Sequence, residues 1–399
     1  MIHENQYFFR SPLLDIKQQV IGYRLAWQKN AQDAVSATAD ASALLGIVAE
    51  AVRDTKSGLL LIDAPLRELS AGLLQTLLPS TTVLILKSEE LAAAENAALV
   101  TSLCQKGFGL AVCDVDLAFL MANRLLLAQT TYILTRFNHP EFQEICSFVR
   151  QRMNPVCMVA EDIQSWRVLE ECAALGAYGF FENLCQVPRQ ISRPTKLSPQ
   201  ARQILQLMQL VQGNTDIRDL EKVLKSDVTL SYKLLQYINS AGFGLKVEIE
   251  SPRHAVAMLG YAPMFRWLLL LLARTNTAGF SQALMQAAMV RGRFAELLGQ
   301  GFLPRREAEN LFIVGMYSFL DLLLGVSVRE VLGQLVLPEG VLQAIESRNG
   351  VYGQVLTLAE ASERQDGSVA NLTQDLVMTS THVNQAHLSA ISWAQGIKF

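Results

Sequence analysis

The chain of 399 residues has no excess of positive charge, and its cysteines are few and scattered. Its 34 lysines and arginines face 37 aspartates and glutamates, which gives a formal net charge of -3 at pH 7. Proteins that bind nucleic acid normally carry a basic patch for the phosphates, so no nucleic-acid partner is predicted. The six cysteines include no C-x-x-C pair. Their spacing argues against a zinc site and is typical of a reducing compartment, so we predict a cytoplasmic protein.

Long apolar segments and glycine-rich loops are also missing. The longest purely apolar run, Trp267 to Ala273, is far shorter than the roughly 18 residues that a membrane-spanning helix needs. No basic region followed by an apolar core opens the chain, so no secretory signal is expected. No glycine-rich phosphate loop follows an apolar run, which argues against a dinucleotide-binding fold. Half of the residues are hydrophobic, which is enough to bury the cores of two or more domains.

Short apolar runs recur at a steady interval through the first half of the chain, with helical patterns between them. The runs are residues 59–62, 83–86, 110–112, 132–134, 156–159 and 178–181. Buried strands that alternate with helices indicate a parallel sheet. Six such units after an N-terminal hairpin predict a (β/α) barrel, and an open doubly wound sheet is the alternative. The fold class is therefore α/β in this half.

Four motifs follow one another in this half. They are RSPLLD at residues 10–15, VIGYRLA at 20–26, GFGLAVCD at 107–114 and AEDI at 160–163. They resemble motifs of the EAL domain, a bacterial barrel that hydrolyses cyclic di-GMP. The family patterns at these places are x-Q-P-I-x-D, v-x-G-y-E-A-L, G-x-x-l-A-l-D-D and A-E-x-V-E. The motifs come in the family's order on the expected elements. The resemblance implies a barrel of EAL type over residues 1–187.

Most positions that hold metal or catalytic groups in that family have changed here. The remnant EAL positions are Arg24, Asp63, Cys113, Asp114, Leu134, Glu161 and Phe181. Arg24 stands where the family has a metal-binding glutamate, and a cation is incompatible with a site for a hard divalent metal. Two-metal hydrolysis needs several convergent carboxylates, so we expect no metal, no cofactor and no hydrolysis. We expect Asp114 and Glu161 to pair with Arg24 or Lys87 at the strand ends.

The stretch from Leu224 to Leu272 reads as three helices separated by two breaks. It resembles the signature of the HDOD domain family, and the matching polar and glycine positions are Asp227, Asn239, Ser240, Gly244, Ser251 and Gly260. Ser251 before Pro252 is a helix cap, and Gly260 ends that helix. Asn239 either satisfies backbone groups at a helix end or contacts a ligand or partner.

The second half is helical by pattern and follows a proline-containing segment. We expect a linker at residues 188–198 and an all-α HDOD-like domain at residues 199–399, ending in an amphipathic C-terminal helix. HDOD domains are related to HD phosphohydrolases. Their His-Asp pair would fall near Ser318 and Phe319, where neither residue is present. The resemblance therefore implies no chemistry in this half.

Together the two resemblances imply a bacterial signalling protein in which a degenerate EAL barrel precedes an HDOD domain. We expect a non-enzymatic adaptor that binds other signalling proteins, and a homo-oligomer is compatible with the sequence. Candidate interaction residues are Phe243, Tyr261 and Arg266, because the helical pattern does not require large side chains there. One alternative is a receptor that binds cyclic di-GMP weakly without cleaving it. Another is a divergent cyclic di-GMP phosphodiesterase.

Overall fold

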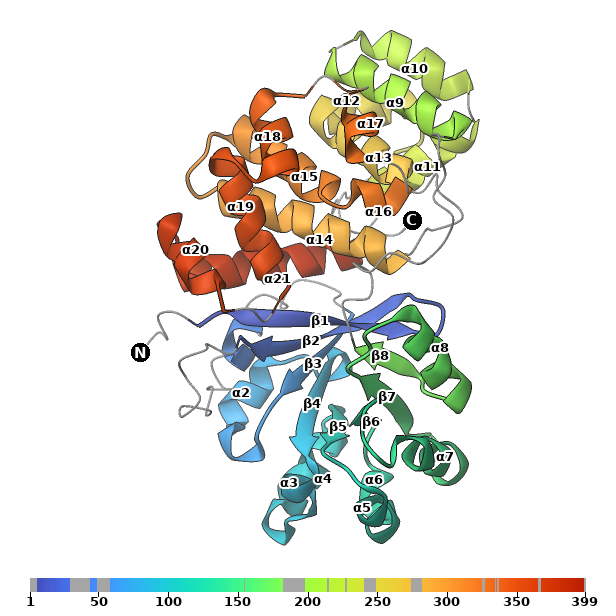
Figure 1. Ribbon diagram of the computed structural model, residues 1–399, viewed down its shortest axis with the longest axis vertical. Coiled ribbons are helices and arrows are strands. Elements are labelled where there is room, and N and C mark those ends of the chain that lie inside the picture. The colour runs from blue at the N-terminus through green and yellow to red at the C-terminus, as the bar shows by residue number, and fades with distance from the viewer. Residues whose placement is uncertain are drawn as a thin grey trace. The chain divides into compact units, whose positions relative to one another are not determined.

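The computed structural model divides the chain into two compact units (Figure 1). The first contains Met1–Val187 and Ala361–Leu388, and the second contains Pro188–Glu360 and Ser389–Phe399. The structure describes residues 6–28, 44–48, 58–153, 155–181, 198–213, 215–226, 228–239, 249–273, 282–324, 327–333, 335, 337–364 and 367–397.

Eight strands close the first unit into a barrel in which spatial order follows chain order. They are β1 (Phe8–Asp15), β2 (Val20–Trp27), β3 (Leu59–Asp63), β4 (Thr82–Lys87), β5 (Gly109–Cys113), β6 (Tyr132–Arg136), β7 (Cys157–Glu161) and β8 (Gly179–Phe181). β1 is antiparallel to both β2 and β8, whereas β2 to β8 are parallel to their neighbours. The predicted (β/α) barrel is confirmed, and the open doubly wound sheet is not the fold.

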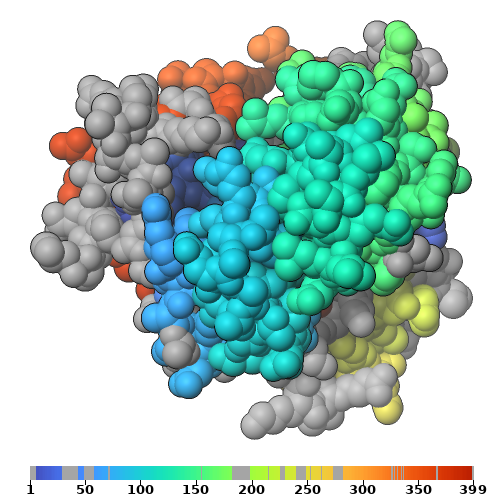
Figure 2. All heavy atoms as spheres, turned by 90° about the horizontal axis from the view of Figure 1, so that it is seen from below, coloured from blue at the N-terminus to red at the C-terminus, as the bar shows by residue number. Residues whose placement is uncertain are grey.

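Helices cover the outside of the barrel between the parallel strands. They are α2 (Ala71–Thr76), α3 (Ser88–Ala92), α4 (Ala97–Gln105), α5 (Leu117–Ala122), α6 (Arg124–Leu127), α7 (Phe142–Arg152) and α8 (Trp166–Leu175). Figure 2 shows the residues coloured cyan to green, which include α3 to α7, covering the face turned to the viewer. α5 and α6 are separated at Asn123, whose Nδ2 donates to Phe119 O at 3.0 Å. Such local side-chain bonds compete with helix continuation.

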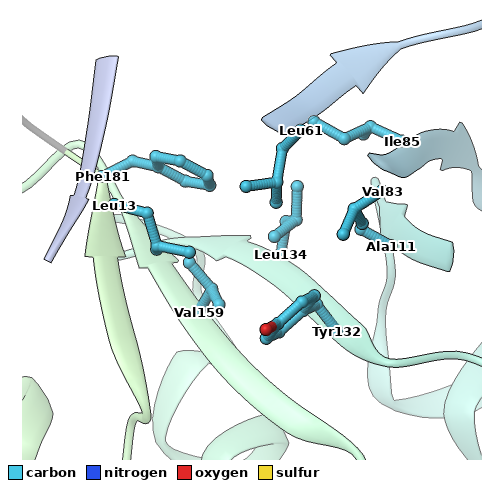
Figure 3. Packing of buried hydrophobic residues seen from close by; sticks show 9 residues of the cluster. All are labelled: Leu13, Leu61, Val83, Ile85, Ala111, Tyr132, Leu134, Val159 and Phe181. Atoms are coloured by element: carbon cyan, nitrogen blue, oxygen red, sulfur yellow. The ribbon is translucent and has the colours of Figure 1, made fainter. Parts of the chain in front are cut away.

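Apolar side chains fill the inside of the barrel (Figure 3). The cluster consists of Leu13, Leu61, Val83, Ile85, Ala111, Tyr132, Leu134, Val159 and Phe181. Figure 3 shows these side chains, which come from seven different strands, pointing toward one another. Because a strand turns alternate side chains to the same side, each strand contributes every second residue to this core.

The second unit is all-helical among its described residues. Its helices are α9 (Pro199–Gln212), α10 (Ile217–Ser226), α11 (Val228–Ile238), α12 (Pro252–Leu259), α13 (Tyr261–Ala273), α14 (Gln282–Gly299), α15 (Arg305–Tyr317), α16 (Leu320–Leu324), α17 (Val328–Leu332), α18 (Glu339–Ser347) and α19 (Gly350–Ala361). The backbones of α14 and α15 are in contact where the two helices cross. A Cβ atom added at Gly315 would lie only 2.6 Å from Gly292 Cα, so glycine is needed there. The all-α class predicted for this half is confirmed.

The helical domain was expected to contain all of residues 199–399, and this boundary was wrong. Residues 361–388 group with the barrel and not with the helical domain. This segment holds α20 (Val369–Asp375) and the first half of α21 (Ser380–Gly396). Phe8 of β1 stacks on His387 with ring centroids 4.7 Å apart, and its N–H donates to Asn384 Oδ1 at 3.2 Å. Arg10 Nη2 pairs with Glu363 Oε1 at 2.9 Å. Helical periodicity shows which face is apolar but not which surface covers it.

In the part of the chain that the structure describes, no single helix has both the length and the apolar character to cross a membrane. The helical segments Arg253–Leu259 and Pro263–Leu272 are long and apolar enough only when taken together, and the chain bends by 115° between them.

Because His387 is buried, we expect the free energy of unfolding to depend on pH. Burial lowers the pKa of His387 well below its ordinary value, and the charge of Arg10 lowers it further. As pH falls below about 6.5, the unfolded chain takes up the proton before the folded chain does. The stability contributed by neutral His387 is therefore complete above that pH and lost on acidification. Thermal melts between pH 7.5 and 5 should fall more steeply for the natural chain than for His387→Met, and parallel curves would contradict this.

Candidate functional site

Polar and charged side chains form the next layer above the apolar core of the barrel. Asp63, Cys113 and Glu161 end strands β3, β5 and β7. Each lies two residues beyond a member of the interior cluster, so the alternation of a strand turns it to the same inner side. In a (β/α) barrel this carboxyl end of the strands is where sites are built. The sequence thus brings these side chains together at the mouth of the barrel.

Arg24 of β2 joins two of these residues. Its Nη2 donates to Asp63 Oδ1 at 2.8 Å, and its Nε donates to Asp63 Oδ2 at 3.2 Å. Its Nη1 donates to Glu161 Oε1. The guanidinium also lies over the Phe181 ring, 5.9 Å from the centroid. Arg24 is therefore held in one place by two carboxylates and an aromatic ring.

The environment of this cluster shifts the pKa of three groups. Burial acts to lower the pKa of Arg24, but Asp63 and Glu161 outweigh it and hold the pKa above its ordinary value. Burial raises the pKa of Glu161, and the charge of Arg24 opposes that rise. Burial, together with Asp114 and Asp63, raises the pKa of Cys113 to about 12. Cys113 is therefore a neutral thiol at physiological pH, which makes it a poor nucleophile.

The other remnant positions take different places. Leu134 and Phe181 belong to the interior core. Asp114 is exposed and has a φ of 55°, a left-handed conformation that aspartate tolerates better than most residues. Its Oδ2 lies 3.8 Å from Cys113 Sγ. The structure thus brings Glu161 and Asp63 to Arg24, while Asp114 lies beside Cys113.

The arrangement does not fit a divalent metal. Asp63 and Glu161 both direct oxygens at the Arg24 guanidinium. The fixed cation therefore neutralises one of the two carboxylates and occupies the oxygens that a metal ion would need. Over the described ranges, no group of three or more His, Cys, Asp or Glu side chains could hold a metal ion. We derive no step that uses a metal.

In the helical unit, the described signature residues shape the ends of helices. Asn239 follows α11, and its Nδ2 donates to Ile249 O at 2.9 Å while Ile249 N donates back to its Oδ1 at 2.8 Å. Ser251 caps α12 by accepting from His254 N at 3.2 Å. Gly260 ends α12 with a φ of 75°, a conformation that favours glycine. Asp227, Ser240, Gly244 and the candidate contact Phe243 lie outside the described residues.

The two remaining candidate contact residues have partners inside the second unit. Tyr261 donates its hydroxyl to Thr215 O at 2.9 Å. Arg266 Nη2 pairs with Glu296 Oε1 at 2.5 Å, and only 15% of the Arg266 side chain is exposed. Arg266, named above as a candidate interaction residue, is therefore expected to contribute to the fold itself. The helical pattern missed this pair because Glu296 lies on another helix, α14.

Arg293 and Glu296 are charged residues that the sequence reasoning overlooked. Arg293 Nη1 donates to Glu296 Oε2 at 2.8 Å, and the Glu296 side chain is 3% exposed. Their spacing of three residues on one helix is the available signal, because such residues are neighbours on a helix surface.

Asn239→Leu should destabilise the protein by about 1–3 kcal/mol, because the N–H and C=O of Ile249 lose both partners. Chemical denaturation of the full chain measures this cost. Gln236→Leu, in the last turn of α11, is the matched control, since the exposed Gln236 side chain donates to the Tyr232 hydroxyl at 2.9 Å and not to the backbone at the helix end. Equal stability of Asn239→Leu and the natural chain would assign Asn239 to contacts with a partner.

Arg266→Glu should cost about 3–5 kcal/mol, because it sets a second carboxylate against buried Glu296. Arg329→Glu provides the control, since Arg329 is 85% exposed and its pair with Glu346 is on the surface. Denaturation curves of the two variants give the comparison. If Arg266→Glu were as stable as Arg329→Glu, the Arg266–Glu296 pair would contribute little to the fold.

The comparisons with known proteins agree with a two-part architecture. The HDOD domain family matches residues 196–320. Cyclic di-GMP phosphodiesterase CdgJ of Vibrio cholerae is 25% identical over 98% of this chain and 93% of its own. The uncharacterized protein YuxH of Bacillus subtilis is 25% identical over 48% of this chain and 47% of its own. Among solved structures, the EAL domain of Mycobacterium smegmatis DcpA gives a TM-score of 0.36 at 13% identity, covering 45% of this chain and 91% of that chain.

The similarity to CdgJ overturns one prediction. From Arg24, Cys113, Leu134 and Phe181 we expected a protein that is not an enzyme, yet a relative that is similar along 98% of the chain is named as a phosphodiesterase. The prediction treated each changed position as a loss of chemistry. It expected Asp114 and Glu161 to pair with Arg24 or Lys87, but it gave that pairing no catalytic role.

The family match also fits the start of the second unit. Ser198, the last residue of the expected linker, caps α9 by accepting from Ala201 N at 3.1 Å. The family range ends at Phe319–Leu320, where α15 gives way to α16. The family match thus falls on the helical unit, which follows the eight-stranded barrel in the chain.

Proposed function

We propose that this protein acts in cyclic di-GMP signalling as a divergent phosphodiesterase, with its site at the mouth of the barrel around Arg24, Asp63 and Glu161. The observation that carries the proposal is the similarity to CdgJ, which extends over both parts of the chain in the same order. The charged cluster is the part of the barrel whose chemistry suits a phosphodiester. It combines a fixed cation with a carboxyl group of raised pKa.

Arg24 is the group that recognises the phosphate. A guanidinium presents a planar fork of N–H donors that matches the oxygens of a phosphodiester and keeps its charge at any physiological pH. Asp63 fixes that fork through three bonds, at 2.8, 3.1 and 3.2 Å. A fixed donor loses little freedom when it binds, so this pairing orients Arg24 for its ligand.

Glu161 is the group that transfers a proton. Its pKa is raised by burial, which brings a carboxyl group closer to the pH at which acid–base catalysis is efficient. In its ionised form Glu161 accepts a proton from a water molecule as the water oxygen bonds to phosphorus. The P–O ester bond then breaks, and the leaving alkoxide oxygen takes up a proton from solvent water. Protonated Glu161 returns its own proton to solvent, which restores the base. Cys113 has no part in this step, because its thiol stays protonated.

The first test is hydrolysis of cyclic di-GMP by the purified full chain, followed by chromatography of the linear product. Glu161→Gln should lower turnover about a hundredfold or more, the usual effect of removing a general base. Glu171→Gln is the control, since Glu171 lies on the outer helix α8 in a surface pair with Arg167. Binding of cyclic di-GMP without turnover in the natural chain would contradict the phosphodiesterase and leave the receptor. Chelator should not abolish turnover if Arg24 supplies the positive charge.

The pH profile gives a second test, in which binding and turnover change in opposite directions. As pH falls toward the raised pKa of Glu161, protonation removes a negative charge beside Arg24 and should strengthen binding of the dinucleotide. The same protonation removes the base, so turnover should fall. KM and kcat measured from pH 8 to 5 should therefore decrease together in the natural chain, and Glu161→Gln should lose this pH dependence. A rise in KM on acidification would contradict the role of Glu161.

Contacts with other signalling proteins, the cytoplasmic location and a homo-oligomeric state remain predictions from the sequence. Interaction through the HDOD domain is compatible with a barrel that cleaves a nucleotide, because the proposed chemistry uses residues of the first unit alone.

A further inference from the structure

A polar cavity lies within the helical unit. It has a volume of about 520 Å³ and is lined by α13, α14 and the start of α15. Its charged lining includes Arg266, Arg293, Glu296 and Arg305. This volume is within the range of sites for small molecules, about 300–1,000 Å³. The cavity therefore has the size of a ligand site. The charges of its lining residues determine which kind of ligand fits.

Two arginines share one buried carboxylate at this cavity. Arg266 donates to Glu296 from Nη2 at 2.5 Å and from Nη1 at 3.2 Å. Arg293 donates from Nη1 to Glu296 Oε2 at 2.8 Å. The two arginines therefore share a single negative charge, that of Glu296. Arg305 at the rim does not alter this count, because it pairs with Glu309 at 3.4 Å. The group of Arg266, Arg293 and Glu296 has a net positive charge.

Both guanidinium groups are held before any ligand arrives. Arg266 lies over the Phe312 ring at 4.7 Å from the centroid, and Arg293 lies over the Trp393 ring at 5.8 Å. Their side chains are 15% and 26% exposed, and that of Glu296 is 3% exposed. A guanidinium carries more N–H donors than the bonds to Glu296 use. The cavity therefore presents fixed donors and a surplus positive charge in a partly desolvated place, where electrostatic attraction is stronger than in water.

We propose that this cavity binds a small molecule through a phosphate group seated against Arg266 and Arg293. A phosphate monoester carries more charge than a carboxylate and offers three oxygens, so it satisfies two guanidinium forks at once. Glu296 sets the geometry of the two arginines and leaves one positive charge for the ligand. The site is separate from the barrel mouth and does not depend on the reaction proposed there.

The test uses inorganic pyrophosphate as the probe and the full chain in calorimetric titration. Arg293→Gln should weaken binding about tenfold or more, since a hydrogen bond to a charged group contributes on that scale. Arg329→Gln is the matched control, because it removes an equal charge from an exposed position of the same unit. Equal losses in the two variants would show general attraction of anions and overturn the proposal.

A second variant and a second anion make the test specific. Glu296→Gln keeps the shape and an acceptor oxygen but removes the negative charge, so it should tighten pyrophosphate binding several-fold. Unchanged or weaker binding in a folded Glu296→Gln variant would contradict the proposed charge balance. Acetate at equal concentration should not compete with pyrophosphate, and competition at equal strength would assign the cavity to carboxylates. Circular dichroism melts of each variant check that the fold is retained.

Discussion

The alternation of side chains along the barrel strands is the constraint on which the first unit depends. Residues such as Leu61 and Val159 must point inward to fill the barrel, and the residue two places later then points inward as well. At the strand ends that inward residue is Asp63 or Glu161, and it is only partly covered. The same rule that builds the apolar core therefore gathers carboxylates at one end of it. Arg24 offsets the repulsion between these charges that their approach would otherwise cause.

The second unit meets a comparable constraint through the crossing of α14 and α15. Gly292 and Gly315 let the two backbones touch, and this close approach brings the end of α14 and the start of α15 to the same cavity. Glu296, one turn beyond Gly292, is then too buried to remain ionised without partners. Arg266 from α13 and Arg293 from α14 supply them. The arginine pair is thus a consequence of how closely these helices pack.

Much of the fold was open to prediction from the sequence, because local signals and the global fold agree. The six apolar runs became strands β3 to β8, and Ser251 and Gly260 delimit α12 as capping rules require. The predictions failed where the outcome depends on which surfaces meet. Nothing in the periodicity of residues 361–388 indicates that Phe8 and Arg10 of β1 are their partners. Such contacts join residues that are distant in the chain, and a pattern read within one segment carries no information about them.

The candidate site shows the same limit in chemical terms. The sequence identified Arg24 and Glu161 as altered and retained positions, and it suggested that they pair. It could not show that Asp63 binds the same guanidinium through two oxygens, or that burial raises the pKa of Glu161. Those two facts change the meaning of Arg24. As an isolated substitution it replaces a residue that the EAL resemblance makes a metal ligand, whereas in the cluster it is a cation held by two carboxylates. The chemistry of a site follows from the charges that face one another, so a single changed residue does not decide whether catalysis is lost.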